Sequence, residues 1–447
     1  MSRCQRVQPS QPQNRTTLCR ASHMNIVVIG AGIVGLTSAH ALNRAGHAVT
    51  VLDSQPQAVM GCSQANGGFL SPSHCAPWAA PGLARLALKC MFDPVAPMRW
   101  RPDFSIDQWR WIAALLGQAS ANRFALNRAR MLALARYSRE CHDKADAELG
   151  FSYARHHDGV LQLCRSAAGM AAMQRQRDAL RADGVDAVWR SREETLQLEP
   201  ALDSAMPDLL GALHIIHEGA GSCESHGRQL AQHLARQGVR FEWNATVDGF
   251  EVLAPDGSAS SRKLHSIRVK GQTLNADACV VAAGPDTAKL LARHLRVPIY
   301  PVKGYSMTAP IAERTAAPRR AVIDERSKLA IAAFDNVVRV AGFADVVGYD
   351  LRLDSARCQQ LVAGFDALYP GVADTRNAQF WAGLRPMTPD GTPIVGATGI
   401  KGLYLNSGHG TYGWTLSHGS AQLVAECIDG KNPTLNPADY ALSRFKS

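Results

Sequence analysis

The sequence of 447 residues predicts an α/β protein in which a Rossmann-like nucleotide-binding domain is interleaved with an α+β domain built on a mostly antiparallel sheet. Three observations support this fold class. An apolar strand pattern at 25–29 leads into a glycine turn and a helical pattern. Similar buried-strand patterns return at 276–283 and 403–406, and segments without a regular strand-helix repeat lie between them. Because the chain also exceeds the usual size of one compact domain, we expect two domains.

The composition excludes several other classes of protein. No window reaches eighteen consecutive apolar residues, so we expect no membrane-spanning helix. The net charge of +10 is dispersed, without a Lys/Arg run or a nucleic-acid motif, so we expect no nucleic-acid partner. The 11 cysteines are an odd number without a Cys-x-x-Cys pair, which argues against a disulfide framework or a zinc site. We therefore expect no metal and a reducing, cytoplasmic location.

Residues 1–23 are polar and rich in Arg, Gln and Ser, and a second methionine, Met24, follows them. This composition predicts a disordered leader rather than a signal peptide. We expect the fold to begin at Met24, and the sequence leaves open whether the leader is translated.

The strongest motif is a glycine turn between the first strand, 25–29, and the helix that follows it. The turn reads Gly30-Ala31-Gly32-Ile33-Val34-Gly35. Gly30 permits a tight turn, Gly32 lets the backbone approach a pyrophosphate, and Gly35 lets the helix pack on the strand. A second strand, 48–52, ends in Asp53, at the distance where an acid can accept hydrogen bonds from ribose hydroxyls. The motif and its context predict a bound dinucleotide.

The segments after Asp53 distinguish between the dinucleotides NAD and FAD. An NAD domain would continue with further strand-helix units. Here the loop 61–72 consists of small residues that allow close approach of a flat ring or a phosphate. We therefore expect FAD, bound by three separate segments at 24–76, 214–297 and 381–440. A substrate-binding domain would comprise 77–213 and 298–380, and 441–447 would form a tail.

The remaining patterns indicate which elements each segment contributes. Helical spacing is found at 106–116, 123–148 and 223–237, and strands are expected at 239–243, 245–250, 299–308, 329–334 and 337–343. Two further patterned segments, 159–164 and 170–182, belong to the inserted substrate domain. Asp335-Asn336 would form a hairpin turn between the last two strands.

Several segments together resemble the D-amino-acid oxidase and glycine oxidase superfamily of FAD-dependent flavoproteins. Within it they are most similar to the small subunits of bacterial D-amino-acid dehydrogenases, from Met24 nearly to the C-terminus. These segments are Val28 to Gly35, Ser63-Gln64-Ala65-Asn66-Gly67-Gly68, Ala76-Pro77-Trp78-Ala79-Ala80-Pro81-Gly82, Val302-Lys303-Gly304-Tyr305-Ser306, Trp381 to Gly396 and Asn406 to Trp414.

The resemblance implies that Arg385, in Gly383-Leu384-Arg385-Pro386, binds the substrate carboxylate, and that Tyr305 approaches the substrate. A planar guanidinium suits a carboxylate because it offers two parallel hydrogen bonds and stays charged when desolvated. The alternative for Arg385 is a structural ion pair, and Tyr305 could instead be a core residue. His409 is expected to be structural. Residues implied for noncovalent FAD binding are Val28, Ile29, Gly30, Ala31, Gly32, Ile33, Val34, Gly35, Asp53, Ser63, Asn66, Gly67, Gly68, Val247, Ala283, Gly284, Gly408, His409, Gly410, Thr411, Tyr412, Gly413, Trp414 and Thr415.

The activity that the resemblance implies is oxidative deamination of D-amino acids to 2-oxo acids and ammonia, part of amino-acid catabolism. A hydride would pass from the substrate Cα to flavin N5, and the electrons would go to a quinone. Three alternatives remain: an oxidase that uses dioxygen, a dehydrogenase for D-proline or hydroxy-D-proline, and a noncatalytic flavin-binding subunit. The preferred side chain, the electron acceptor and the oligomeric state stay open.

The segment 77–111 allows two interpretations. It combines Trp78, Leu83, Leu86, Leu88, Met91, Phe92, Trp100, Trp109 and Trp111 with Arg and Lys residues. Such a segment could dock peripherally on the inner face of the cell membrane, or its apolar side chains could fill the core of the substrate domain.

Overall fold

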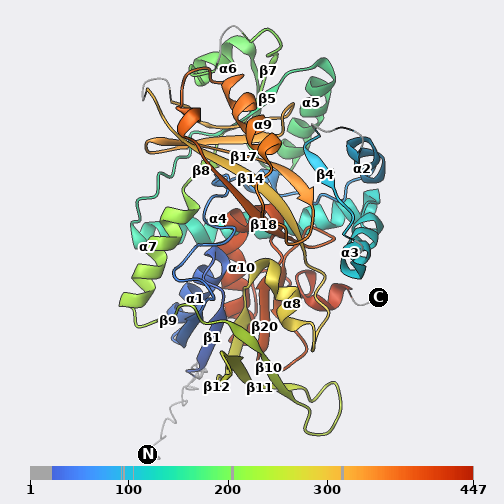
Figure 1. The fold of residues 1–447 in the computed structure, drawn as a ribbon, viewed down its shortest axis with the longest axis vertical. Coiled ribbons are helices and arrows are strands. Elements are labelled where there is room, and N and C mark those ends of the chain that lie inside the picture. The colour runs from blue at the N-terminus through green and yellow to red at the C-terminus, as the bar shows by residue number, and fades with distance from the viewer. Residues whose placement is uncertain are drawn as a thin grey trace, which may run out of the picture.

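The structure is a computed structural model, and it describes residues 23–445 except 92, 94–95, 104, 203–205 and 314–316. Residues 1–22 of the predicted leader lie outside the described residues. The chain forms two lobes, each around its own sheet (Figure 1). A six-stranded sheet lies in the lower lobe in that view, and a nine-stranded sheet lies in the upper lobe. The predicted mixture of a parallel nucleotide-binding sheet and an antiparallel second sheet is confirmed.

The central strands of the six-stranded sheet, β13, β1 and β2, are short apolar runs that are mostly buried, as in parallel sheets covered on two sides. The strand order is β19-β20-β13-β1-β2-β9, and only the edge strand β19 runs antiparallel to its neighbour. Val28 lies opposite Val51 on one side and Val280 on the other. The strands are β1 (Asn25–Ile29), β2 (Ala48–Leu52), β9 (Arg240–Glu242), β13 (Ala278–Val281), β19 (Ile394–Ala397) and β20 (Leu403–Ser407).

Helices cover one face of this sheet. Val28 packs there with Leu36, Leu134 and Leu423, which come from three different helices. The helices on this side are α1 (Ile33–Arg44), α4 (Ala121–Leu149), α7 (Cys223–Arg236) and α10 (Gly413–Ile428). The other face is covered by a three-stranded sheet, β10 (Val247–Leu253), β11 (Lys263–Val269) and β12 (Gln272–Leu274), and by α8 (Thr287–Leu291).

The nine-stranded sheet has the order β18-β14-β17-β16-β15-β5-β7-β6, with β4 paired to β17. Most of its neighbours are antiparallel. The strands are β4 (Met98–Trp100), β5 (Val160–Cys164), β6 (Ala187–Ser191), β7 (Gly211–Ile215), β14 (Tyr300–Pro310), β15 (Ala321–Asp324), β16 (Leu329–Phe334), β17 (Val337–Val346) and β18 (Gln379–Met387). The lobe also carries α2 (Leu83–Met91), α3 (Ile106–Gly117), α5 (Ala167–Ala182), α6 (Arg192–Leu198) and α9 (Ser355–Asp366), and a small sheet joins β3 (Phe69–Leu70) to β8 (Gly219–Ala220).

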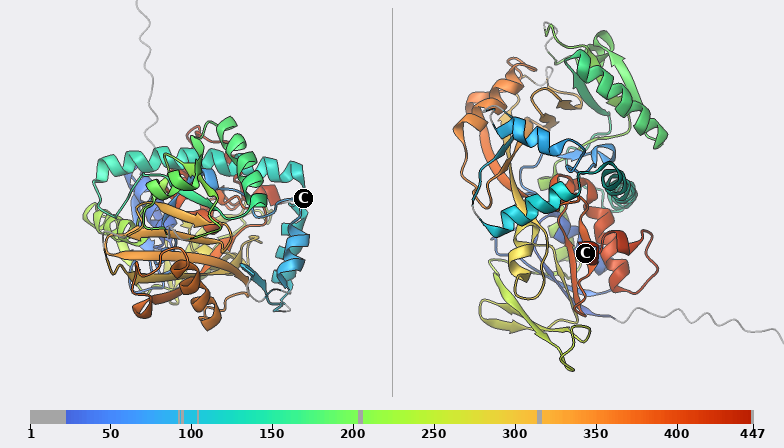
Figure 2. Two further views of the ribbon diagram at one scale, coloured as in Figure 1. Left: turned by 90° about the horizontal axis from the view of Figure 1, so that it is seen from above. Right: turned by 90° about the vertical axis from the view of Figure 1, so that its right-hand side faces the viewer.

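Several elements cross the domain boundaries that we expected from the sequence. β7 spans the boundary at 214, and β18 extends through the boundary at 381 while pairing with β14 over its whole length. α4, expected in the substrate domain, packs on α10 in the core of the nucleotide-binding lobe. Seen from above in Figure 2, α4, in teal, runs across the width of the molecule. Within the expected tail, Leu442 is buried in the lower lobe.

Some apolar side chains of the segment 77–111 lie in the core and others lie on the surface, so each of the two interpretations fits part of the segment. Leu83 and Trp111 are buried, whereas Leu86, Leu88 and Trp109 are exposed. The side chain of Met91 and all of Phe92 lie outside the described residues. None of the helices in the described ranges is both long enough and apolar enough to cross a membrane.

Candidate active site

A cavity of about 1340 Å³ extends from the glycine turn after β1 to β14 and β18 of the large sheet. Most of the residues that the sequence implied for FAD line it, even though they come from six separate parts of the chain. These are Ile29, Gly30, Gly32, Ile33, Val34, Asp53, Ser63, Asn66, Gly67, Gly68, Val247, Ala283, Gly284, His409, Gly410, Thr411, Tyr412, Gly413, Trp414 and Thr415. Val28, Ala31, Gly35 and Gly408 are not among the lining residues.

The glycine turn packs so closely that no side chain fits at its first or last glycine. A Cβ atom on Gly35 would lie 1.8 Å from the carbonyl oxygen of Gly30, and one on Gly30 would lie 2.5 Å from the carbonyl oxygen of Ala282. Gly32, by contrast, lines the cavity and has only the Ser63 hydroxyl near its missing side chain. The two outer glycines therefore serve packing, and the middle one leaves the helix N-terminus open toward the cavity.

Asp53 holds the turn from the end of β2. Its carboxylate accepts a hydrogen bond of 2.5 Å from the amide of Ala31 and another of 2.8 Å from the amide of Gln55. Burial raises the pKa of Asp53, although these two bonds oppose the shift. The carboxylate thus lines the cavity and is hydrogen-bonded to Ala31, the second residue of the glycine turn.

The small-residue loop after β2 is fixed by hydrogen bonds to both lobes. The Ser63 hydroxyl accepts from the amide of Ile33 at the start of α1, and Asn66 accepts from the amide of Gly68. The guanidinium of Arg339, in β17, donates to the carbonyl of Gln64 at 3.3 Å. The loop thus connects the nucleotide turn to the large sheet along the cavity.

A second helix, α10, also begins at the cavity. The residues before it form a short 3-10 turn, Gly410–Tyr412, and neither N-cap residue, Gly32 of α1 or Tyr412 of α10, provides a capping side chain. Helix N-termini carry partial positive charge and bind anionic groups. Two such termini at one cavity fit a dinucleotide whose pyrophosphate and flavin ring both carry or develop negative charge.

His409 is structural, as expected. It is buried, its Nε2 atom lies 2.9 Å from the Ser420 hydroxyl, and burial lowers its pKa to about 3. The ring is therefore neutral at physiological pH, and its Nε2 atom is engaged with the Ser420 hydroxyl in α10.

Arg385 projects from β18 at the opposite end of the cavity from Asp53. It shares a sheet face with Gly304 and Gly383, because side chains alternate along the paired strands β14 and β18. Its Nη1 atom donates to the carbonyl of Phe343 at 2.7 Å, and burial lowers its pKa from a very high ordinary value. Among the residues that the structure describes, no carboxylate lies within 4.0 Å of its guanidinium. A half-buried cation without an ion pair, facing a cavity, is suited to binding an anion.

Phe343 has a backbone conformation that non-glycine residues rarely adopt, with φ of 61°. It lies where the pairing of β14 and β17 shifts register, between Lys303 and Tyr305. This conformation accompanies the hydrogen bond from Arg385 to the Phe343 carbonyl. Strained backbone often occurs at functional sites, and here it supports the position of the guanidinium.

The side chain of Tyr305 lies in the core, which is the alternative to the substrate-approaching role that the resemblance implied. Tyr305 lies along the cavity wall, but alternation in β14 turns its side chain to the opposite sheet face from Gly304 and Arg385. Its ring packs in the core beneath α9, and its hydroxyl donates to Asp345 at 3.2 Å. Asp345 in turn pairs with the buried Arg357 at 2.7 Å. Tyr305 thus belongs to a polar network behind the strand.

Sequence reasoning missed a polar group elsewhere in the cavity wall. His74 lines the cavity, and its Nδ1 atom lies 2.5 Å from the Ser71 hydroxyl and 3.7 Å from the buried carboxylate of Glu218. Burial alone would raise the pKa of Glu218, but the hydrogen bond from His74 and others lower it, so the carboxylate is ionised. No local motif joins residues 71–74 to residue 218, and only the pairing of β3 with β8 brings them together.

The fold and the cavity define a two-lobed flavoprotein of the dinucleotide-binding class. The profile of the FAD dependent oxidoreductase family, DAO, matches residues 25–427, and the chain belongs to this family.

The fold is also that of several solved flavoproteins. It is similar to glycine oxidase from Bacillus cereus, with 19% identity, a TM-score of 0.70 and coverage of 92% of this chain and 96% of that one. L-proline dehydrogenase from P. horikoshii has 19% identity and a TM-score of 0.69, with 95% and 98% covered. L-amino acid deaminase from Proteus vulgaris has 17% identity and a TM-score of 0.66, with 95% and 94% covered.

Proposed function

We propose that this FAD-dependent oxidoreductase oxidises the carbon-nitrogen bond of D-amino acids, giving 2-oxo acids and ammonia. The observation that carries the proposal is the guanidinium of Arg385, which faces the cavity without a carboxylate partner among the described residues. The oxidised flavin, when bound noncovalently in this cavity, supplies the acceptor for the hydride that leaves the substrate Cα. Relatives named as glycine oxidase, proline dehydrogenase and amino acid deaminase support a substrate with both an amine and a carboxylate.

In this proposal the chain orients the substrate and excludes water from the reacting carbon. Arg385 binds the substrate carboxylate through two parallel hydrogen bonds, which fixes the direction of the Cα–H bond. Trp381 lies on the same sheet face, and its ring covers Gly383 so closely that a Cβ atom there would come within 1.8 Å. The indole therefore forms an apolar wall next to the carboxylate site. The imine product hydrolyses in water without a protein nucleophile.

The first experiment is anaerobic mixing of the flavin-loaded protein with D-alanine, L-alanine, D-proline and glycine, one at a time. Loss of the flavin absorbance with D-alanine, followed by its return on addition of a ubiquinone analogue, is expected. Reduction by D-proline alone would replace the proposed substrate by a cyclic imino acid, and rapid reoxidation by dioxygen would indicate an oxidase. No reduction by any of the four would contradict the proposal and favour a noncatalytic flavin subunit.

Arg385→Ala gives an independent test of the same site. The variant should retain the flavin, while kcat/KM for D-alanine falls by the equivalent of about 2 to 4 kcal/mol because the carboxylate loses its charged partner. Arg385→Lys should recover only part of the loss, since an ammonium cannot form the two parallel hydrogen bonds. Wild-type kinetics in Arg385→Ala would remove this residue from the substrate site.

We also propose that the electrons pass to a quinone at the membrane surface on the cytoplasmic side. The support is an exposed apolar group near one end of the cavity. Leu86 lines the cavity and is exposed, and Leu88, Trp109 and Leu351 are exposed on neighbouring segments. Exposed leucine and tryptophan among basic residues are typical of peripheral membrane contact.

Sedimentation with anionic lipid vesicles tests this second proposal. Leu88→Glu should reduce the fraction that binds and slow reduction of a membrane quinone, without changing flavin reduction by D-alanine. Leu253→Glu is the matched control, because Leu253 is equally an exposed leucine but lies on β10. Equal vesicle binding by wild type and both variants would rule out this surface.

A further inference from the structure

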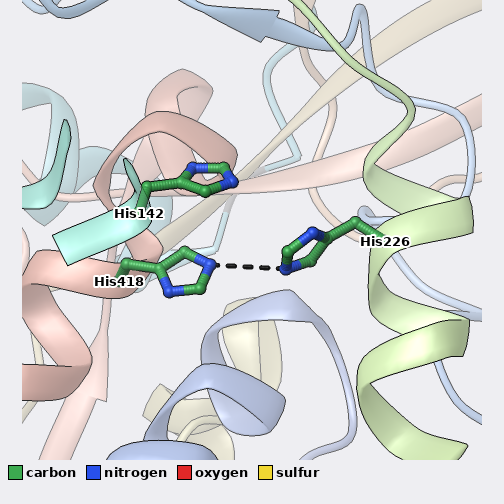
Figure 3. Close-up of side chains that lie close together, drawn as sticks. All are labelled: His142, His226 and His418. Carbon is green, nitrogen blue, oxygen red and sulfur yellow. Dashed lines mark hydrogen bonds between the residues drawn. The ribbon is translucent and has the colours of Figure 1, made fainter. Parts of the chain in front are cut away.

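Three histidines from three different helices meet in the core between α4, α7 and α10. They are His142, His226 and His418, and their exposed fractions are 2%, 0% and 5%. Figure 3 shows the rings of His142 and His418 beside each other, with His226 facing them from α7. One ring nitrogen of each lies within 4.8 Å of the other two. The sequence predicted no metal because the cysteines show no metal-binding pattern, and these histidines are far apart along the chain.

The spacing of the closest pair fits a shared metal ion. The Nε2 atoms of His226 and His418 are 3.4 Å apart. Two imidazole nitrogens bound to one tetrahedral ion at about 2.0 to 2.1 Å lie about 3.3 to 3.4 Å from each other. The third ring, His142, is stacked on His418 with centroids 4.3 Å apart, and one of its ring nitrogens lies within 4.8 Å of a nitrogen of each of the other two rings.

Oxygen donors lie beside the third histidine. The His142 Nε2 atom is 3.1 Å from the Tyr153 hydroxyl, which itself donates to Asp146. The other carboxylate oxygen of Asp146, Oδ1, is buried, has no hydrogen-bond partner among the described residues, and lies 3.6 Å from His142. A carboxylate beside a ligating histidine is a common supporting contact in metal sites, and it offsets part of the added charge.

The side chains of the cluster are chemically suited to a transition metal. An imidazole offers a nitrogen lone pair to a metal ion. Three imidazoles without a thiolate suit Zn²⁺ and the neighbouring transition metals rather than Ca²⁺ or Mg²⁺.

We propose that His142, His226 and His418 bind one divalent transition-metal ion, with Zn²⁺ as the probe, and that the ion links α4 to α7 and α10. The cluster adjoins the cofactor loop, because the Trp414 ring packs on His142 at 4.8 Å and on His226 at 4.9 Å. Trp414 also lines the large cavity. The ion would therefore fix the base of the loop that begins α10. This site is separate from the substrate-binding end at Arg385.

The test is zinc binding by the flavin-loaded protein, first stripped with a chelator and then dialysed against Zn²⁺. Wild type is expected to retain one ion per chain, and X-ray absorption at the zinc edge should show three imidazole nitrogens at about 2.0 Å. His226→Gln should weaken binding by more than the roughly 10 to 100-fold that loss of a supporting residue causes. His233→Gln, on the same helix but outside the cluster, should bind as wild type does.

Either of two results would overturn the proposal. One is less than stoichiometric zinc in wild type, and the other is equal affinity in His226→Gln and His233→Gln. Retained flavin absorbance confirms that each variant is folded. If His226→Gln loses its flavin, the X-ray absorption spectrum of the wild type decides alone, because coordination by fewer than three imidazoles would contradict the proposed site.

Discussion

Gly304 lies directly beneath Arg385: a Cβ atom at position 304 would come within 2.4 Å of the guanidinium carbon. The two residues belong to paired strands, β14 and β18, and face the same side of the sheet. Because Gly304 has no side chain, the guanidinium of Arg385 can lie close to the backbone of β14.

Gly304→Ala should displace Arg385 and raise the KM for D-alanine at least tenfold, because an added methyl group cannot fit under the guanidinium. The flavin should remain bound. Gly117→Ala is the control, since Gly117 is an exposed residue at the end of α3 with only the tip of Arg123 near a Cβ atom. Steady-state kinetics of the two variants test this prediction. An unchanged KM in Gly304→Ala would show that substrate binding tolerates a displaced Arg385 guanidinium.

Tyr305→Phe should lower stability more than it lowers activity. Removing the hydroxyl leaves Asp345 with one hydrogen bond fewer, which costs about 1 kcal/mol. Because the side chain faces α9, kcat for D-alanine should stay within about twofold of wild type. Tyr137→Phe, which removes the hydrogen bond to Glu426, gives a matched loss far from Arg385. A tenfold fall in kcat for Tyr305→Phe alone would restore the substrate-contacting role implied by the resemblance.

His409 should make stability depend on pH. Its folded pKa, about 3, lies below the unfolded value of 6.5, so the unfolded chain takes up a proton between these values and the folded one does not. The contribution is complete above pH 6.5 and is lost as the pH falls toward 3. Between pH 7 and pH 5 it amounts to about 2 kcal/mol.

Chemical denaturation of wild type and His409→Asn at pH 7 and pH 5 measures this contribution. The variant should lose less stability on acidification than wild type by about 2 kcal/mol. His217→Asn, which removes an exposed histidine, is the control. Parallel losses in wild type and His409→Asn would contradict the assignment of a neutral, buried ring.

Asp53→Ala should weaken FAD binding at least tenfold. The change removes the acceptor for the amide of Ala31 and the carboxylate that lines the cavity at the end of β2. Fluorescence titration of the flavin-free variant with FAD measures the dissociation constant. The alternative outcome, unchanged affinity, would mean that the turn keeps its shape without this carboxylate.

Local patterns were enough to predict the nucleotide-binding half of this fold. The strand, turn and helix around Gly30 are encoded within twenty residues, and Gly30 and Gly35 have no room for a Cβ atom, as a tight turn and close helix packing require. The branched runs that form β13 and β20 were also visible, because parallel strands that are buried on both faces are continuously apolar.

What the sequence could not provide was the face on which a side chain lies. Tyr305 and Gly304 are neighbours in one motif, yet strand alternation sends them to opposite sides of the sheet. The pairing of His74 with Glu218, and the meeting of His142, His226 and His418, depend on contacts between distant segments. Such contacts exist only after the sheets have formed.

The order of strands in the six-stranded sheet also bears on synthesis of the protein. β1, near residue 25, pairs with β13, and β13 pairs with β20, which ends at Ser407. The α10 N-terminus follows only at Gly413. A ribosome must therefore complete most of the chain before the flavin pocket can close. We expect the cofactor to bind after these segments have been synthesised, and chains truncated before β20 to be colourless.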